Sequence, residues 1–274
     1  STPPPPALVR FNPRTAFGTA TTKDHIYNTP RAWYMQRHLN PSEDWDSPAA
    51  RYTPASDDIP WCRVPENAVT IEDVDFLMGA HFEGTPYDPY GTLGTPESRH
   101  RYRPIGINRT GHMVAMQIRP YAPAESRSIM WISYGSGPFT AATPFYANVN
   151  DTPAYLRDTT PEVSTGNLYW TNRLIAALAD AHFYETSNAV AAFAESARVF
   201  GHRLVERTDA ALEQADRAQR SGQDAGESVI ARLEAANTEM AEYLRKHATK
   251  LLNDVLYTSS NLMHNGFAMS DRWN

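Results

Sequence analysis

Hydrophobic positions recur at helical spacing through the last third of the chain. From about residue 166 onward, apolar side chains return every three or four positions, which places them on one face of an α-helix. The pattern is interrupted between Gln219 and Gly226, so we expect long helices on both sides of this break. The clearest stripe belongs to the last helix and consists of Val229, Ile230, Leu233, Met240, Tyr243, Leu244, Leu251, Leu252 and Val255.

Two strands are predicted in the middle of the chain. The segments HMVAMQIR (112–119) and SIMWISYG (128–135) are nearly continuous apolar runs, a pattern typical of strands covered on both faces. The short loop between them is compatible with an antiparallel hairpin. Before them, TIEDVDFLMGA (70–80) predicts a helix that begins at Thr70, and the segment 81–99, rich in Gly and Pro, predicts a loop.

Residues 1–68 carry many prolines and few periodic stretches. Each proline fixes its own φ and biases the preceding residue toward extended geometry, so long helices are not expected here. One short helix is predicted over residues 30–38, with Pro30 in its first turn. The apolar material of this region is aromatic, and we expect it to be buried: Trp33, Tyr34, Trp45, Tyr52 and Trp61.

These patterns divide the chain into an irregular part (1–68), a part with a helix, a loop and the sheet core (69–165), and a helical part (166–274). We interpret all three as one α+β domain over residues 1–274. The chain has 41% hydrophobic and 20% charged residues, which is enough apolar material for a core. The net charge of −6 and the lack of a basic cluster argue against nucleic-acid binding, and no apolar run is long enough to span a membrane.

Three polar side chains that can carry chemistry share one loop: His81, Glu83 and Asp88. They could bind a metal or share a proton, but we favour a simpler interpretation in which Glu83 and Asp88 hydrogen-bond the backbone of a tight loop. With Cys62 as the single cysteine, a multi-cysteine metal site is excluded, and the H-E-x-x-H pattern of zinc peptidases is absent. No metal or cofactor is expected.

Other single residues leave two interpretations open. Cys62 precedes Arg63, a cation that would favour a reactive thiolate, but an isolated cysteine is more often a buried filler, which we favour. Arg109, just before the first strand, could orient a carboxylate or stabilise charge at a reacting centre, or form a partly exposed ion pair. Asn148 and Asn150 could donate to an oxyanion, but residues of this type near a proline more often build turns.

Several blocks of sequence together resemble the dipeptidase A family of peptidases, which is related to secernins. The blocks occur in family order over roughly residues 10–270, and the upstream segments YNTPRAWYMQRHLNP (27–41) and SDDIPW (56–61) are similar to bacterial members. The five main blocks are HFEGTPYDPYG (81–91), RYRPIGINRT (101–110), QIRPYAP (117–123), PFYANVNDTP (144–153) and LYWTNRLIAALADAH (168–182).

The resemblance implies an N-terminal-nucleophile hydrolase with a four-layer αββα sandwich, in which two antiparallel sheets lie between helices. Its nucleophile is a Cys that becomes the first residue when a short leader is removed, and the free α-amino group serves as the base. Such enzymes hydrolyse dipeptides with broad preference through a thioester acyl-enzyme, without a metal or cofactor.

The chain departs from the family at the nucleophile. Family members are much longer, and their nucleophile Cys and oxyanion-hole Asn come before the blocks matched here, so Cys62 lies in the wrong block. Ser1 is not a substitute, because a residue followed by Thr2 and four prolines cannot open a strand. We therefore interpret the chain as the C-terminal portion of the enzyme, with a cut end at Ser1 and the nucleophile on a separate or missing segment.

By its position before the first strand, Arg109 is the residue that the resemblance places nearest the thiolate. The loop with His81, Glu83 and Asp88 is expected to bind substrate by shaping the dipeptide pocket. Expected partners are the dipeptide, the segment that carries the nucleophile, and further copies in a homo-oligomer. The alternatives are a related amidohydrolase acting on N-acyl amino acids and an inert half-fold with a scaffold role. The sequence leaves the cellular compartment open.

Overall fold

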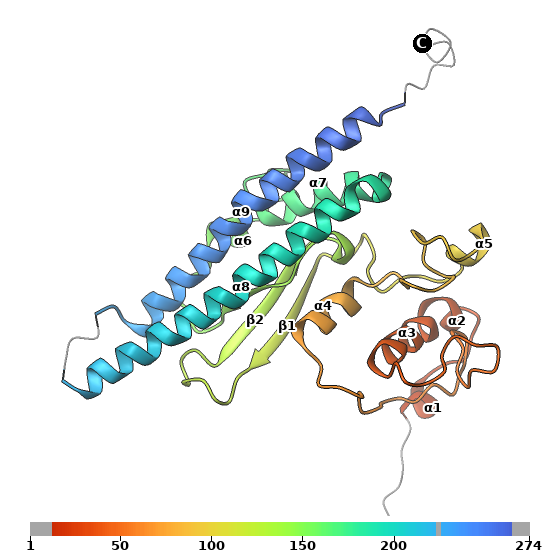
Figure 1. The fold of residues 1–274 in the computed structure, drawn as a ribbon, viewed down its shortest axis with the longest axis horizontal. Helices are drawn as coiled ribbons and strands as arrows, with labels where there is room; N and C mark the ends of the chain where they lie inside the picture. Colours follow the sequence, from red (N-terminus) through yellow and green to blue (C-terminus); the bar gives the residue numbers. More distant parts are fainter. Residues whose placement is uncertain (1–12, 223–225, 265–274) are drawn as a thin grey trace, which may run out of the picture. The chain divides into compact units, whose positions relative to one another are not determined.

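The chain divides into two compact units. The computed structural model describes residues 13–222 and 226–264. Unit 1 holds the described residues up to Thr70 together with His81–Ile105, and unit 2 holds Ile71–Ala80 and the described residues from Gly106 onward (Figure 1). The prediction that residues 1–274 form a single domain is not tested by this division into units and stays a prediction.

Unit 1 contains short helices joined by long loops: α1 (Pro13–Phe17), α2 (Asp24–Tyr27), α3 (Thr29–Leu39) and α5 (Pro96–Arg99). The helix predicted over 30–38 is confirmed as α3. The prediction that 81–99 is entirely loop was wrong at its end, because Thr95 and Ser98 cap α5 reciprocally. The Thr95 hydroxyl accepts from Ser98 N at 3.2 Å, and the Ser98 hydroxyl accepts from Thr95 N at 3.0 Å.

Aromatic rings form the core of unit 1. Trp33 and Tyr34 of α3 are each 2% exposed. The Tyr34 ring meets Phe82 edge-on, with centroids 5.5 Å apart, and Trp33 meets Tyr87 in the same way at 6.2 Å. Such edge-to-face pairs add to the burial of apolar area. The expectation that all five aromatic residues are buried was wrong for Trp61, which is 60% exposed.

Unit 2 is built from regular elements. A three-stranded antiparallel sheet has the order β1-β2-β3, so the predicted hairpin and the α+β class are confirmed. The break predicted between Gln219 and Gly226 is confirmed to within about two residues, because α8 ends at Arg220 and α9 begins at Val229; residues 223–225 lie outside the described residues. The elements are α4 (Ile71–Gly79), β1 (His112–Ile118), β2 (Ser128–Tyr134), the 3-10 helix η1 (Gly137–Phe139), β3 (Thr143–Tyr146), α6 (Ala154–Arg157), α7 (Leu168–Ala181), α8 (Phe183–Arg220) and α9 (Val229–Asn261).

One face of the sheet packs against helices. Figure 1 shows α8 and α9 as two long rods that run side by side along the strands. Ile129 and Trp131 of β2 are each 1% exposed, and the Trp131 ring lies 4.7 Å from that of His202 on α8. At Gly201 the helix approaches β3 so closely that an added Cβ would lie 2.5 Å from Cδ of Pro144. The absence of a side chain at residue 201 therefore sets the packing distance.

The opposite face of the sheet is apolar and exposed along β1. Val114, Met116 and Ile118 are 41%, 82% and 70% exposed. The prediction that both strands are covered on both faces was wrong for β1, because successive side chains of a strand point to opposite faces and the described chain leaves this face of β1 open. On β2 the same face is half-buried, and on β3 it is buried, as at Phe145, which is 4% exposed. The apolar run of β1 therefore indicates two apolar faces, of which one is uncovered among the described residues.

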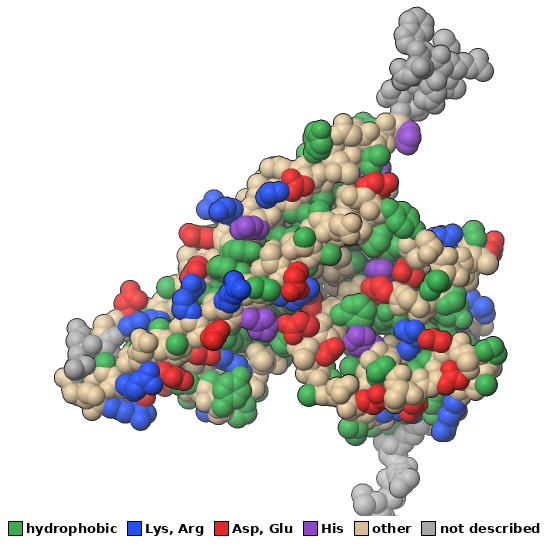
Figure 2. Space-filling model, in the orientation of Figure 1, with side chains coloured by type: hydrophobic (Ala, Val, Ile, Leu, Met, Phe, Trp, Pro, Cys, Tyr) green, Lys and Arg blue, Asp and Glu red, His purple; other side chains and the backbone are tan. Residues whose placement is uncertain are grey.

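The surface of the long helices mixes both signs of charge. Figure 2 shows acidic and basic side chains interspersed along α8 and α9. Several are i,i+4 ion pairs, such as Arg220–Asp216 and Lys250–Asp254, which stabilise an exposed helix modestly. None of the described helices combines the length and apolarity required to cross a lipid bilayer.

Candidate functional site

His81 lies between two carboxylates in unit 1. Its Nδ1 is 2.8 Å from Oδ1 of Asp88, and its Nε2 is 3.1 Å from Oε1 of Glu83. His81 and Asp88 are buried, and the edge of the Tyr90 ring packs against the imidazole at a centroid distance of 5.0 Å. The structure thus brings together the three residues that the sequence predicts to bind substrate.

Glu83 is held by its second oxygen as well. Its Oε2 accepts hydrogen bonds from His81 N at 2.9 Å and from the Tyr34 hydroxyl at 3.1 Å. Burial raises the pKa of Tyr34 far above its ordinary value, and the negative charge of Glu83 acts in the same direction, so this hydroxyl stays a donor. Sequence reasoning missed Tyr34, which appeared only as a core aromatic on a predicted helix.

The backbone at this site is constrained. Phe82 has φ of 71°, a left-handed conformation that is unusual for a residue with a side chain. Its ring is buried against Tyr34 and Tyr102, and its carbonyl accepts from both the amide and the hydroxyl of Thr85. Aromatic packing therefore holds a strained residue between His81 and Glu83, as is common where side chains must be aimed accurately.

The arrangement can hold or pass a proton along a carboxylate–imidazole–carboxylate chain. Glu83 is its accessible member, with a side chain 31% exposed against 10% for His81 and 10% for Asp88. The carboxylates also bond the loop backbone, as the simpler interpretation predicts, since Asp88 accepts from Tyr90 N at 2.9 Å. Within the described ranges, no group of three or more His, Cys, Asp or Glu side chains is arranged to hold a metal ion.

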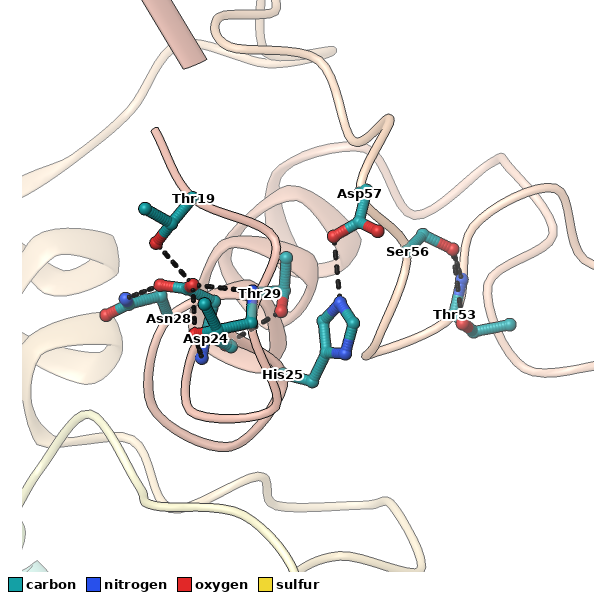
Figure 3. A network of polar contacts seen from close by, with 9 residues as sticks. Thr19, Asp24, His25, Asn28, Thr29, Thr53, Ser56 and Asp57 are labelled. Atoms are coloured by element: carbon teal, nitrogen blue, oxygen red, sulfur yellow. Dashed lines mark hydrogen bonds and ion pairs between the residues drawn. The ribbon is translucent and has the colours of Figure 1, made fainter. Parts of the chain in front are cut away.

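A second polar network in unit 1 surrounds Asp24 (Figure 3). Its carboxylate accepts from the hydroxyl of Thr19, from the amide and hydroxyl of Thr21, and from the side-chain amide of Asn28. The hydrogen bond from Thr19 and those from Thr21 lower the pKa of Asp24 well below its ordinary value. A cavity of about 580 Å³ lies alongside. Because four donors already occupy this carboxylate, we assign it to holding the chain before α3 rather than to chemistry.

Arg109 belongs to unit 2. It is exposed, and it lies in a turn closed by a hydrogen bond from Thr110 N to the Ile107 carbonyl at 3.0 Å, three residues before β1 begins. Among the described residues it has no hydrogen-bond or ion-pair partner, so the alternative of an ion pair at the strand entrance does not explain it. Its placement near a thiolate remains a prediction.

The chain is similar to known peptidases over most of its length. The family model of peptidase family C69 matches residues 5–196. The chain belongs to peptidase family C69. The resemblance to the dipeptidase A family is thereby confirmed, and the matched range of this C69 chain contains His81, Glu83, Asp88 and Arg109.

Curated relatives of this C69 chain carry the name dipeptidase. A "Dipeptidase" of Bifidobacterium longum (strain NCC 2705) is 49% identical and matches 95% of the chain and 55% of its own length. A "Probable dipeptidase A" of Streptococcus pyogenes serotype M18 is 43% identical over 95% of the chain and 51% of its own length. A "Dipeptidase A" of Lactobacillus helveticus is 33% identical over 92% and 50%. The C69 chain thus spans about half the length of these relatives.

The single thiol of the C69 chain is exposed, so the expectation of a buried filler was wrong. Cys62 lies in a loop of unit 1, where the apolar neighbours that a filler requires are replaced by solvent. Arg63 does not serve as a cation for this thiol, because its guanidinium pairs with Glu43 at 2.6 Å and lies over the rings of Trp45 and Tyr52.

The two asparagines after β3 lie in a loop, as the turn interpretation predicts. The side-chain amide of Asn148 donates to the Glu125 carbonyl at 3.2 Å, and the backbone of Asn150 donates to Glu234 at 2.9 Å. These contacts tie the loop to the hairpin and to α9, which is a structural role.

Proposed function

We propose that this C69 chain is part of a cysteine-type dipeptidase whose nucleophile Cys lies on a segment outside residues 1–274. The observation that carries the proposal is the match of 95% of the chain, at 49% identity, to about half of a relative named dipeptidase. The exposed position of Cys62, with the neighbouring cation engaged by Glu43, favours a nucleophile elsewhere.

In the proposed reaction, the sulfur of an N-terminal Cys attacks the carbonyl carbon of the dipeptide. The free α-amine of that Cys takes the thiol proton and gives it to the leaving amino group as the peptide bond breaks, which leaves a thioester. Water then attacks the thioester, the acid product departs, and the proton returns to the sulfur. Hydrogen-bond donors around the carbonyl oxygen stabilise the tetrahedral intermediates. We assign Arg109 to the vicinity of the thiolate.

The residues around His81 are proposed to bind the substrate. Glu83 presents a partly exposed carboxylate, and His81 and the Tyr34 hydroxyl fix its two oxygens. Asp88 holds His81 from the other side. A carboxylate fixed in this way suits the wall of a pocket for a small polar substrate, because its direction is set before binding.

The proposal includes the four-layer sandwich. In unit 2 the helices α8 and α9 cover one face of the sheet, while the other face exposes apolar side chains of β1. Soluble proteins rarely leave such a face open. A second sheet packed on it would complete the order helix, sheet, sheet, helix.

The test uses the complete enzyme and its C62S variant. We expect one polypeptide or segment of the purified enzyme to begin with Cys, as read by mass spectrometry. Iodoacetamide should abolish dipeptide hydrolysis by labelling that residue. The reagent should inactivate the C62S variant to the same extent as the unmodified enzyme. Loss of activity through labelling of Cys62 alone would overturn the assignment. A panel of dipeptides against N-acyl amino acids tests the substrate class.

A further inference from the structure

The two edges of the sheet in unit 2 differ. Ala147 N donates to the Ser128 carbonyl at 3.2 Å, so residues 143, 145 and 147 point their backbone groups toward β2, and Ala142, Pro144 and Tyr146 point theirs outward. Each outward position lacks a free N–H. Ala142 N donates to Asp75, Pro144 has no N–H, and Tyr146 N donates to Oδ1 of Asn237 at 2.8 Å.

The same Asn237 side chain also donates to the Tyr146 carbonyl at 3.0 Å, so it occupies this edge as a neighbouring strand would. Edge strands of soluble proteins are commonly closed by prolines or covering groups, since an open edge pairs with other chains. The β3 edge is closed in this way.

The β1 edge is open within the described residues. Arg119 N donates to the Arg127 carbonyl and Gly135 N to the Gly111 carbonyl, so the odd-numbered residues of β1 pair with β2. The outward positions of β1 are His112, Val114, Met116 and Ile118, and none of their N–H groups has an acceptor in the described part of the chain. Val114, Met116 and Ile118 also carry the exposed apolar side chains of β1, so unpaired polar groups and uncovered apolar groups coincide at these three residues.

We propose that β1 pairs along its outer edge with an extended segment of the same enzyme that lies outside residues 1–274, which makes β1 an inner strand of a wider sheet. The inference rests on the proposed function, because it takes its partner from the remainder of that enzyme. To the proposed function it adds the sheet edge that pairs with the missing segment and the residues of β1 that bind this segment.

Two observations favour this occupant. The relatives are about twice as long as the part that the chain matches, so a further segment of comparable size is present in such enzymes. The β1 edge also favours a partner strand with apolar side chains, because side chains directly opposite Val114, Met116 and Ile118 would lie on the same exposed face of the sheet. A second copy of the chain, joined edge to edge through β1, is the competing occupant.

The first experiment measures hydrogen exchange of single amides in the complete enzyme. We expect the amides of Val114, Met116 and Ile118 to exchange as slowly as those of Met113, Ala115 and Gln117, which pair with β2 and serve as the internal reference. An open edge would instead let the three outward amides exchange at least about tenfold faster than the reference, and that result overturns the inference. Protection that disappears on dilution identifies a second copy and also overturns it.

The second experiment compares M116P with M116A in the complete enzyme. Both variants remove the exposed side chain, but only M116P removes the outward N–H, which β2 does not use. We expect M116P to lower the melting temperature clearly more than M116A does. Equal melting temperatures would contradict the pairing. Dipeptide hydrolysis by the unmodified enzyme is measured separately, so a failure of the proposed function is distinguishable from a failure of the edge pairing.

Discussion

Each of the two units is stabilised internally by a different kind of interaction. Unit 2 derives its order from long regular elements, since α8 and α9 pack against each other and against the sheet. Unit 1 has only short helices, and its chain is tied by side chains that bond distant backbone groups. Examples are Gln36 to the Pro60 carbonyl at 2.6 Å and Arg31 to the Arg103 carbonyl at 3.2 Å.

This difference predicts which substitutions destabilise each unit most. A regular element shares its hydrogen bonds among many equivalent residues, so unit 2 should respond most to changes that disturb close packing. An irregular fold depends on particular polar contacts, so unit 1 should respond to the loss of single hydrogen bonds. Three substitutions test this contrast.

The largest effect is expected for G106A in unit 2. A Cβ at Gly106 would lie 2.1 Å from the carbonyl oxygen of Gly79 and 2.9 Å from its Cα, and this neighbour is backbone that cannot rotate away. We expect the free energy of unfolding to fall by about 3 kcal/mol or more, at the upper end of the range for overpacked sites. Urea denaturation followed by circular dichroism measures it.

The matched control is G111A. A Cβ at Gly111 would meet no heavy atom within 4 Å. This variant should stay within about 0.5 kcal/mol of the unmodified chain. Equal stabilities of G106A and G111A would show that close packing at the end of α4 does not limit unit 2.

An intermediate effect is expected for D88N in unit 1. The substitution removes the negative charge that faces Nδ1 of His81 and weakens the bond from Tyr90 N, in a buried setting. We expect a loss of about 1–3 kcal/mol in the free energy of unfolding. D58N, at an exposed residue, is the control and should be neutral. A neutral D88N would mean that the aromatic core alone holds the loop of residues 81–91.

The smallest effect concerns Asp24 and depends on pH. Its pKa is lowered in the folded state, so its contribution to stability is present above the unfolded pKa of about 3.9 and is lost as pH falls through the lower folded value. The protection factors of the amides of residues 19–29, which correct for the intrinsic pH dependence of exchange, should therefore fall on acidification below about pH 4. D24N should lack this dependence. An unchanged pH profile in D24N would assign the acid sensitivity to other carboxylates.

The sequence predicted unit 2 better than unit 1. Long stripes at helical spacing specify α8 and α9, and two apolar runs specify the hairpin, because these signals are local. β3 was missed, since four residues with Pro144 among them do not look like a strand, although the missing N–H of that proline faces the outer edge.

The site in unit 1 was predicted only where it is local. His81, Glu83 and Asp88 lie within eight consecutive positions, and their clustering in one loop was readable from the sequence. Tyr34 is 49 positions from Glu83, and a pairing at that distance leaves no pattern in a single sequence. The left-handed Phe82 also has no local signal, because its strain is offset by rings from other segments.

The hydrogen bond from Gly106 N to the Ala80 carbonyl, at 2.8 Å, has a consequence for how the gene can vary. Residues 81–105 leave unit 2 and return to it at adjacent points, so their removal would leave two ends that a very short linker can rejoin. Changes in the length of this segment can therefore leave the course of the sheet and its helices unaltered, while the rings of Phe82 and Tyr87 tie the segment to α3 of unit 1.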